Sequence, residues 1–179
     1  MRHSVLSTLV ALALPAALAA QQAPMASTNP TVDAAKASGG YAAKNLMAVA
    51  DQVPADKLGY KPTDAQMTFG QVWAHLVEAN YGICAAFSGT KAPAMAELKG
   101  TESKDVLVTA LKGSFAFCDT ALAKAKDMPL GDQVDLGFMK GTRAFALFVY
   151  VADLSDHYSQ VANYLRLNGM LPPTAQPRK

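Results

Sequence analysis

Residues 151–173 read Val151-Ala-Asp-Leu-Ser-Asp-His-Tyr-Ser-Gln-Val-Ala-Asn-Tyr-Leu-Arg-Leu-Asn-Gly-Met-Leu-Pro-Pro173. This pattern predicts a long helix that ends at Gly169, because glycine accepts the left-handed cap conformation and the two prolines that follow cannot continue a helix. Asp153 and His157 are four residues apart, so their side chains project from one helix face, about one turn apart. A carboxylate and an imidazole at this spacing can bind one metal ion if a third ligand comes from elsewhere in the chain.

The first 20 residues carry the signature of a cleaved secretory signal. Arg2 and His3 precede an apolar run that is too short to span a bilayer comfortably. The run closes with Ala17-Leu18-Ala19, the small-x-small pattern that signal peptidase recognises. We therefore expect a periplasmic or secreted protein that is not attached to a membrane after cleavage of residues 1–20. The alternative is an amphipathic or membrane helix that stays in place.

Length and composition indicate one globular domain that does not bind nucleic acid. The chain has 179 residues, of which 51% are hydrophobic and 17% charged. Its formal net charge is +2, and loss of Arg2 with the signal would lower it to +1. A nearly neutral protein lacks the basic stripe that contacts phosphates. It also keeps only two histidines after cleavage, His75 and His157.

Two cysteines, Cys84 and Cys118, fall in segments predicted to be helical. In an exported protein a disulfide between them would persist and would link two helices. Two buried free thiols are the alternative. Metal binding by these cysteines is disfavoured because the chain has no C-x-x-C pair.

Apolar residues at spacings of three and four, together with capping signals, predict four helices. They are expected over about 31–52, from a Thr68 cap to about Phe87, from a Ser103 cap to near Met128, and from Thr142 to the Gly169 stop. A flexible leader (21–30) and a tail (174–179) flank this part, and no strand is predicted. The sequence thus predicts an all-α four-helix bundle over 31–173, and bundles build metal sites from inward side chains on facing helices.

Three motifs resemble the DinB-like (DinB/YfiT) superfamily, in particular its exported members. They are Tyr60-Lys-Pro-Thr63, Met67-Thr-Phe-Gly-Gln-Val-Trp-Ala-His-Leu-Val-Glu-Ala-Asn-Tyr81 and Asp156-His-Tyr-Ser-Gln-Val-Ala-Asn-Tyr-Leu-Arg-Leu-Asn-Gly-Met-Leu-Pro-Pro173. The resemblance implies a four-helix bundle that is often dimeric, so a homodimer is one expectation. It also implies a divalent metal ion held by three histidines, one in the second helix and two in the last.

Matched by position, His75 takes the first of these places and His157 the last, while Asp153 stands where the family pattern has histidine. Two histidines and one carboxylate suit zinc, nickel or iron. The aspartate is equally consistent with a weakened or lost site. Asp153 is also consistent with an outer role, in which it orients His157 while water completes the metal coordination.

Glu78 and Gln160 lie one helical turn from the expected ligands. Each is a candidate to hydrogen-bond a ligating imidazole or to position water, and a solvated helix face is the alternative for both. No catalytic residue beyond the ligands is assigned, because two histidines do not build a convincing Ser-His-Asp set.

The resemblance implies a metal-dependent hydrolase or thiol S-transferase that acts on an unidentified small molecule. Its characterised members include thiol-dependent S-transferases and a mycothiol-dependent maleylpyruvate isomerase. Export disfavours thiol transfer, because the usual small thiols are cytoplasmic. The alternative class is a non-catalytic periplasmic bundle that binds a metal ion, a small ligand or a partner.

Overall fold

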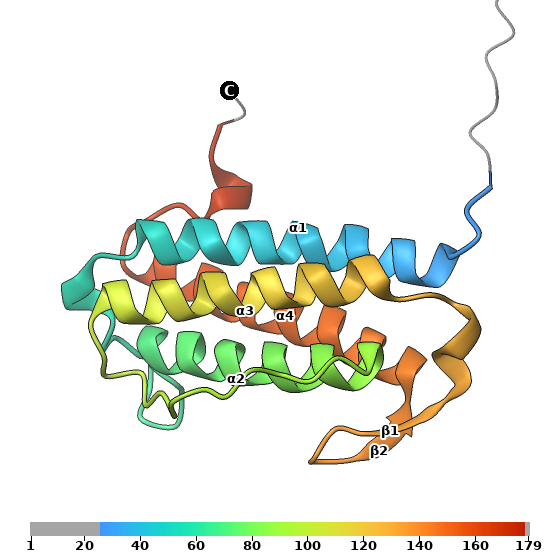
Figure 1. The fold of residues 1–179 in the computed structure, drawn as a ribbon. Helices are drawn as coiled ribbons and strands as arrows, with labels where there is room; N and C mark the ends of the chain where they lie inside the picture. Colours follow the sequence, from blue (N-terminus) through green and yellow to red (C-terminus); the bar gives the residue numbers. More distant parts are fainter. Residues whose placement is uncertain (1–25, 178–179) are drawn as a thin grey trace, which may run out of the picture.

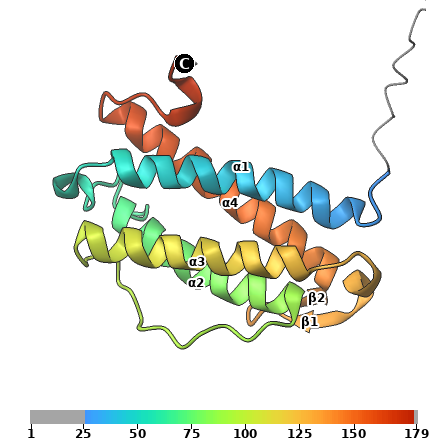
Figure 2. The ribbon, with the colours of Figure 1, turned by 45° about the horizontal axis from the view of Figure 1, so that its top comes forward.

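A computed structural model of the chain describes residues 26–177; the expected signal peptide lies outside them. The chain folds into four long helices, which are α1 (Pro30–Gln52), α2 (Phe69–Ser88), α3 (Lys104–Lys124) and α4 (Arg143–Leu167) (Figure 1). The helix α1 packs along α4 and α2 packs along α3, and these two pairs face each other through contacts of α2 with α4 and of α1 with α3 (Figure 2). The predicted all-α four-helix bundle is confirmed.

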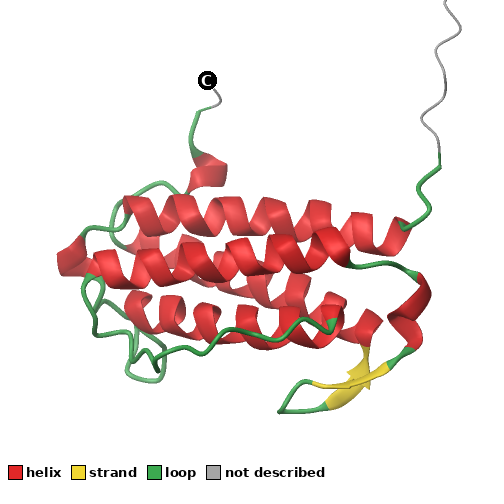
Figure 3. Cartoon of the chain, in the orientation of Figure 1, coloured by secondary structure: helices red, strands yellow, loops and turns green. Residues whose placement is uncertain are grey.

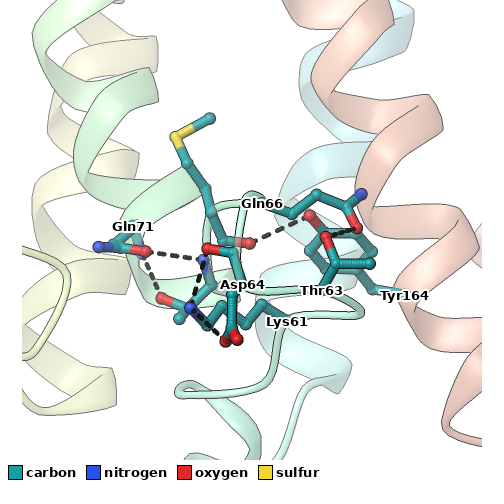
Figure 4. Close-up of polar contacts among 8 residues, drawn as sticks. Lys61, Thr63, Asp64, Gln66, Gln71 and Tyr164 are labelled. Carbon is teal, nitrogen blue, oxygen red and sulfur yellow. Dashed lines mark hydrogen bonds and ion pairs between the residues drawn. The ribbon is translucent and has the colours of Figure 1, made fainter.

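Helix α2 begins and ends where its sequence signals predict. The Thr68 hydroxyl accepts from the Gln71 amide at 3.1 Å, and the Gln71 side chain accepts from the Thr68 amide at 2.9 Å (Figure 4). This reciprocal capping box satisfies two amide groups that the first turn leaves unpaired. At the other end Gly89 takes a φ of 68°, the left-handed conformation that glycine adopts without strain.

Helix α4 follows the predicted bounds closely. The Thr142 hydroxyl accepts from the Phe145 amide at 3.1 Å and caps the first turn. The helix ends at Leu167, and Gly169 has a φ of 73°, so the glycine stop acts as expected.

The third helix is shorter than predicted, because it ends at Lys124 rather than near Met128. A separate 3-10 turn covers Met128–Gly131, with Pro129 in its first turn. Another 3-10 turn, Ala55–Lys57, leads from α1 toward α2.

A small hairpin lies between α3 and α4, in a segment where the sequence predicts no helix and no strand. Strands β1 (Gln133–Asp135) and β2 (Lys140–Thr142) pair antiparallel, with Val134 opposite Gly141 (Figure 3). The prediction of no strand is therefore wrong for this segment. Strands of three residues are too short to give a periodic pattern.

The core lies between the helices and includes a covalent link. The largest fully buried side chains are Trp73, Tyr150, Tyr164 and Phe69. Cys84 of α2 and Cys118 of α3 form a disulfide, and both are completely buried. Helix α3 is apolar and long enough to cross a membrane by composition alone, but in this bundle its Leu107, Leu111 and Cys118 are buried against neighbouring helices.

Both ends of the described chain are tied to the bundle. The Asp127 carboxylate accepts from the amides of Thr31 and Val32, each at 2.9 Å, and so caps the first turn of α1. At the other end Tyr158 and Thr174 share a hydrogen bond of 2.7 Å, and Pro173–Ala175 forms a 3-10 turn. The start of the expected tail thus packs against α4.

Candidate metal centre

The structure brings His75, Asp153 and His157 together between α2 and α4. One ligand-type atom from each residue lies within 4.8 Å of the other two. The Oδ1 atom of Asp153 is 3.6 Å from Nε2 of His75 and 3.5 Å from Nε2 of His157. The two imidazole rings are 4.7 Å apart between centroids and are inclined at 61°. Both Nε2 atoms therefore face the same carboxylate.

The three side chains differ in their access to solvent. The His157 side chain is 8% exposed, that of Asp153 is 21% exposed, and that of His75 is 41% exposed. His157 thus forms the inner side of the cluster and His75 its outer rim. The His75 side is therefore the most solvent-exposed side of the cluster.

The donor set fits a divalent metal ion. Oδ2 of Asp153 is buried and has no hydrogen-bond partner among the described residues. A buried, unpaired carboxylate oxygen costs free energy, and a bound cation would remove that cost. Two imidazole nitrogens and one carboxylate are accepted by zinc, nickel and iron.

The two histidines also shift the protonation of the carboxylate. Burial acts to raise the pKa of Asp153, but the close polar contacts and charge interactions with His157 and His75 outweigh it and lower the pKa to about 2. Burial acts to lower the pKa of His157, and the contacts with Asp153 and Gln160 reverse this and raise it. Asp153 is therefore an anion at neutral pH, as a metal ligand requires.

Of the two residues expected to support the ligands, the structure places one at the cluster. Gln160 Oε1 lies 2.9 Å from Nδ1 of His157, on the ring edge that faces away from Asp153. Glu78 is exposed and lies instead along a pocket of about 270 Å³ that it shares with Met95 and Leu98 of the α2–α3 connection.

Two further residues extend this contact and were not expected from the sequence. The Gln160 amide nitrogen donates to the Tyr164 hydroxyl at 2.8 Å. That hydroxyl donates to the main-chain oxygen of Met67 at 3.0 Å (Figure 4). The spacing of His157, Gln160 and Tyr164 places all three on one helix face, and this signal points to Tyr164. No sequence pattern identifies Met67, because it contributes only its main chain.

A pocket of about 450 Å³ adjoins the inner side of the cluster. It lies between α4 and the segment that leads into α2, and His157, Gln160 and Tyr164 form part of its wall. Asp156, Ser159 and Asn163 add polar groups.

The fold and the cluster define a helical bundle with a candidate metal centre between its second and fourth helices. A family model described as "DinB superfamily" matches residues 41–161, and the chain belongs to this superfamily. No curated protein matches the chain significantly.

Solved structures of the same fold include a DinB-like protein from Bacillus cereus, with 17% identity and a TM-score of 0.65 over 79% of this chain and 95% of that one. A DinB-like protein from Bacillus subtilis has 16% identity and a TM-score of 0.61 over 84% of this chain and 100% of that one. A variant of mycothiol-dependent maleylpyruvate isomerase has 13% identity and a TM-score of 0.60, and the match covers 72% of this chain and 60% of the isomerase. At these identities the similarity shows the fold alone.

Proposed function

We propose that this DinB-superfamily protein binds a divalent zinc, nickel or iron ion through Nε2 of His75, the Asp153 carboxylate and Nε2 of His157. The observation that carries this proposal is the convergence of three ligand-type atoms within 4.8 Å of one another. The second carboxylate oxygen of Asp153, Oδ2, supports it, because this atom is buried and has no hydrogen-bond partner among the described residues. Asp153 thereby takes the place of the histidine that the family pattern has at this position.

We further propose that the bound ion serves catalysis of hydrolysis or thiol transfer on a small molecule. A divalent ion in such a site supplies a Lewis acid that lowers the pKa of water or of a thiol. The chain contributes three ligands, and catalytic sites usually have three protein ligands and an open position. Access at the half-exposed His75 side supports this assignment over a closed structural site.

Different observations support thiol transfer and hydrolysis as the reaction of this protein. The mycothiol-dependent isomerase of similar fold supports a thiol substrate. The expected export of the chain supports hydrolysis, because small thiols are concentrated in the cytoplasm. Export and a homodimer are themselves proposals for this protein.

Elemental analysis of protein purified without chelator and without a histidine tag tests metal binding. We expect near-stoichiometric metal in the wild type and in Asp156→Ala, an exposed neighbour on α4 that is not in the cluster. We expect its loss in His157→Ala. Wild-type protein that takes up no zinc, nickel or iron even after reconstitution would contradict the proposal.

Removal of the metal separates catalysis from a non-catalytic role. A catalytic ion should leave a folded apo-protein when it is chelated, whereas a structural ion contributes folding free energy directly. A folded apo-protein that regains thiol-transfer or hydrolase activity with metal would support the enzyme. A metal-loaded protein inactive in both assays would favour the non-catalytic binding bundle.

A further inference from the structure

Three hydrogen bonds connect the inner imidazole of the cluster to the main chain at the start of α2. The Nδ1 atom of His157 lies 2.9 Å from Gln160 Oε1, Gln160 Nε2 lies 2.8 Å from the Tyr164 hydroxyl, and that hydroxyl lies 3.0 Å from the Met67 carbonyl oxygen. Tyr164 and His157 are buried, and Gln160, which lies between them, is half-buried in the wall of the adjoining pocket.

The direction of each of these three hydrogen bonds follows from the last acceptor, the Met67 carbonyl oxygen. A main-chain carbonyl can only accept, so the Tyr164 hydroxyl must use its single proton toward Met67. The hydroxyl oxygen then accepts from the Gln160 amide nitrogen, which turns the amide oxygen toward His157. An amide oxygen can only accept, and Nδ1 of His157 must therefore carry a proton.

A competing acceptor lies on the opposite edge of the same ring. Asp153 Oδ1 is 3.5 Å from Nε2 of His157, beyond the usual range for an N–H···O hydrogen bond, and it is shared with His75 at 3.6 Å. The Gln160 contact at 2.9 Å is within that range. When the ring holds only one proton, the geometry favours its place on Nδ1.

We propose that Tyr164, anchored on the Met67 carbonyl, fixes the orientation of the Gln160 amide and so keeps the proton of the neutral His157 ring on Nδ1, with Nε2 free to bind a cation. Tyr164 is thus a positioning residue that acts through Gln160. The consequence for metal binding rests on the proposed function, whereas the tautomer is a property of the metal-free protein and is measured there.

The test records long-range 1H–15N correlations of the histidine rings in the metal-free full chain, at a pH at which the His157 ring is neutral. The three histidines are assigned by single substitutions. We expect Nδ1–H in the wild type. Tyr164→Phe keeps the ring that packs against Phe69 and removes the hydroxyl, so the Gln160 amide is free to turn over and Nε2–H should appear.

Tyr158→Phe is the matched control. It removes a hydroxyl from the same helix, one that bonds Thr174 rather than Gln160, and it should leave the tautomer unchanged. Gln160→Met, at a half-buried position, should shift the tautomer as Tyr164→Phe does. Zinc affinity should fall roughly 10–100-fold in both, the usual effect of losing the hydrogen-bond partner of a metal ligand.

The double variant Gln160→Glu/Tyr164→Phe tests whether Tyr164 acts through the orientation of the side chain at position 160 or through its own packing. A carboxylate has acceptor oxygens on both sides, so it cannot present a donor to His157 however it turns. We expect it to restore Nδ1–H without the tyrosine hydroxyl. A wild-type ring with Nε2–H, an unchanged tautomer in Tyr164→Phe, or failure of this restoration would overturn the proposal. Absence of metal binding would contradict only the proposed function, because the tautomer is read without metal.

Discussion

Oδ1 of Asp153 lies 3.6 Å from Nε2 of His75, so a carboxylate of α4 and an imidazole of α2 meet across the interface of two helices. The same oxygen is 3.5 Å from His157, one turn further along α4. Asp153 is therefore the central member of the cluster, although it is the residue that departs from the family pattern.

Replacement of Asp153 by asparagine should weaken metal binding more than loss of an outer hydrogen-bond partner does, a loss that costs roughly 10–100-fold in affinity. The amide keeps the shape of the side chain but removes the charge and one acceptor. Zinc titration calorimetry measures the effect, with Asp156→Asn on the exposed face as control. Asp153→His, which restores the family pattern, should retain binding. Equal affinity of Asp153→Asn and wild type would show that Asp153 does not ligate.

The free energy of unfolding of the apo-protein should be highest in mildly acidic solution. Asp153, whose pKa is lowered to about 2, contributes stability above its unfolded value of about 3.9, and this is lost as the pH falls toward about 2. His157, whose pKa is raised, contributes stability below its unfolded value of about 6.5, and this is lost as the pH rises through its folded value. Urea unfolding across this range measures the profile.

Metal affinity should follow the opposite trend at the upper end of that range. A histidine binds metal only when it is neutral, so metal affinity rises as His157 loses its proton while the apo-protein becomes less stable.

Asp153→Asn should flatten the dependence of apo-protein stability on pH at both ends of the range, since Asp153 is a partner in the pKa shifts of both groups. An unchanged pH dependence of unfolding in Asp153→Asn would show that the interaction of Asp153 with His157 does not set this dependence.

Removal of the disulfide should lower the free energy of unfolding by about 4 kcal/mol, the chain-entropy value for a closed loop of this size. Cys84 and Cys118 are separated by 34 residues and are fully buried. The double variant Cys84→Ala/Cys118→Ala is compared with wild type by guanidinium unfolding, with and without reductant. Reductant should then have no further effect on the variant. Equal stability of the two proteins would contradict this expectation.

Lys104 should stabilise the end of α1. Its Nζ donates to the main-chain oxygens of Asp51 at 2.8 Å and Val53 at 2.7 Å, at the helix end where carbonyl groups lack partners. Lys104→Met keeps the aliphatic stem and should cost about 1–2 kcal/mol. Lys112→Met is the control, because Lys112 makes only an exposed ion pair with Asp51 at 3.9 Å. Similar losses in the two variants would argue against a capping role.

Two glycines of α2 should respond to alanine with opposite signs. A Cβ at Gly70 would lie 2.1 Å from the main-chain oxygen of Gly100, so Gly70→Ala must displace backbone and destabilise the protein. At Gly82 a Cβ meets nothing within 4 Å, and Gly82→Ala should stabilise the helix by about 0.5–1 kcal/mol. Thermal unfolding of both variants checks the signs.

The helices could be predicted because their signals are local. Thr68, Thr142 and Gly169 stand at the helix ends where capping chemistry places them, and the apolar spacing supplies the rest. The hairpin around Gly137 could not be predicted, because its strands depend on pairing with each other rather than on a sequence pattern of their own.

The candidate site could be predicted only in part from the sequence. Asp153 and His157 share a helix face by spacing, but their meeting with His75 depends on the packing of α2 against α4, and only the family resemblance indicated it. By spacing alone, Glu78 and Gln160 are equally good candidates to support a metal ligand, because each lies one helical turn from one. The bundle distinguishes them, because Tyr164 and Met67 hold Gln160 against His157 while Glu78 faces the solvent.

The last acceptor beyond Tyr164 is a main-chain oxygen, and this affects how the protein tolerates mutation. Every amino acid supplies that oxygen, proline included, so no point mutation at position 67 deletes it. A substitution of Met67 therefore leaves in place the group that orients the amide. At positions 160 and 164, in contrast, a single substitution removes a side chain on which the orientation depends.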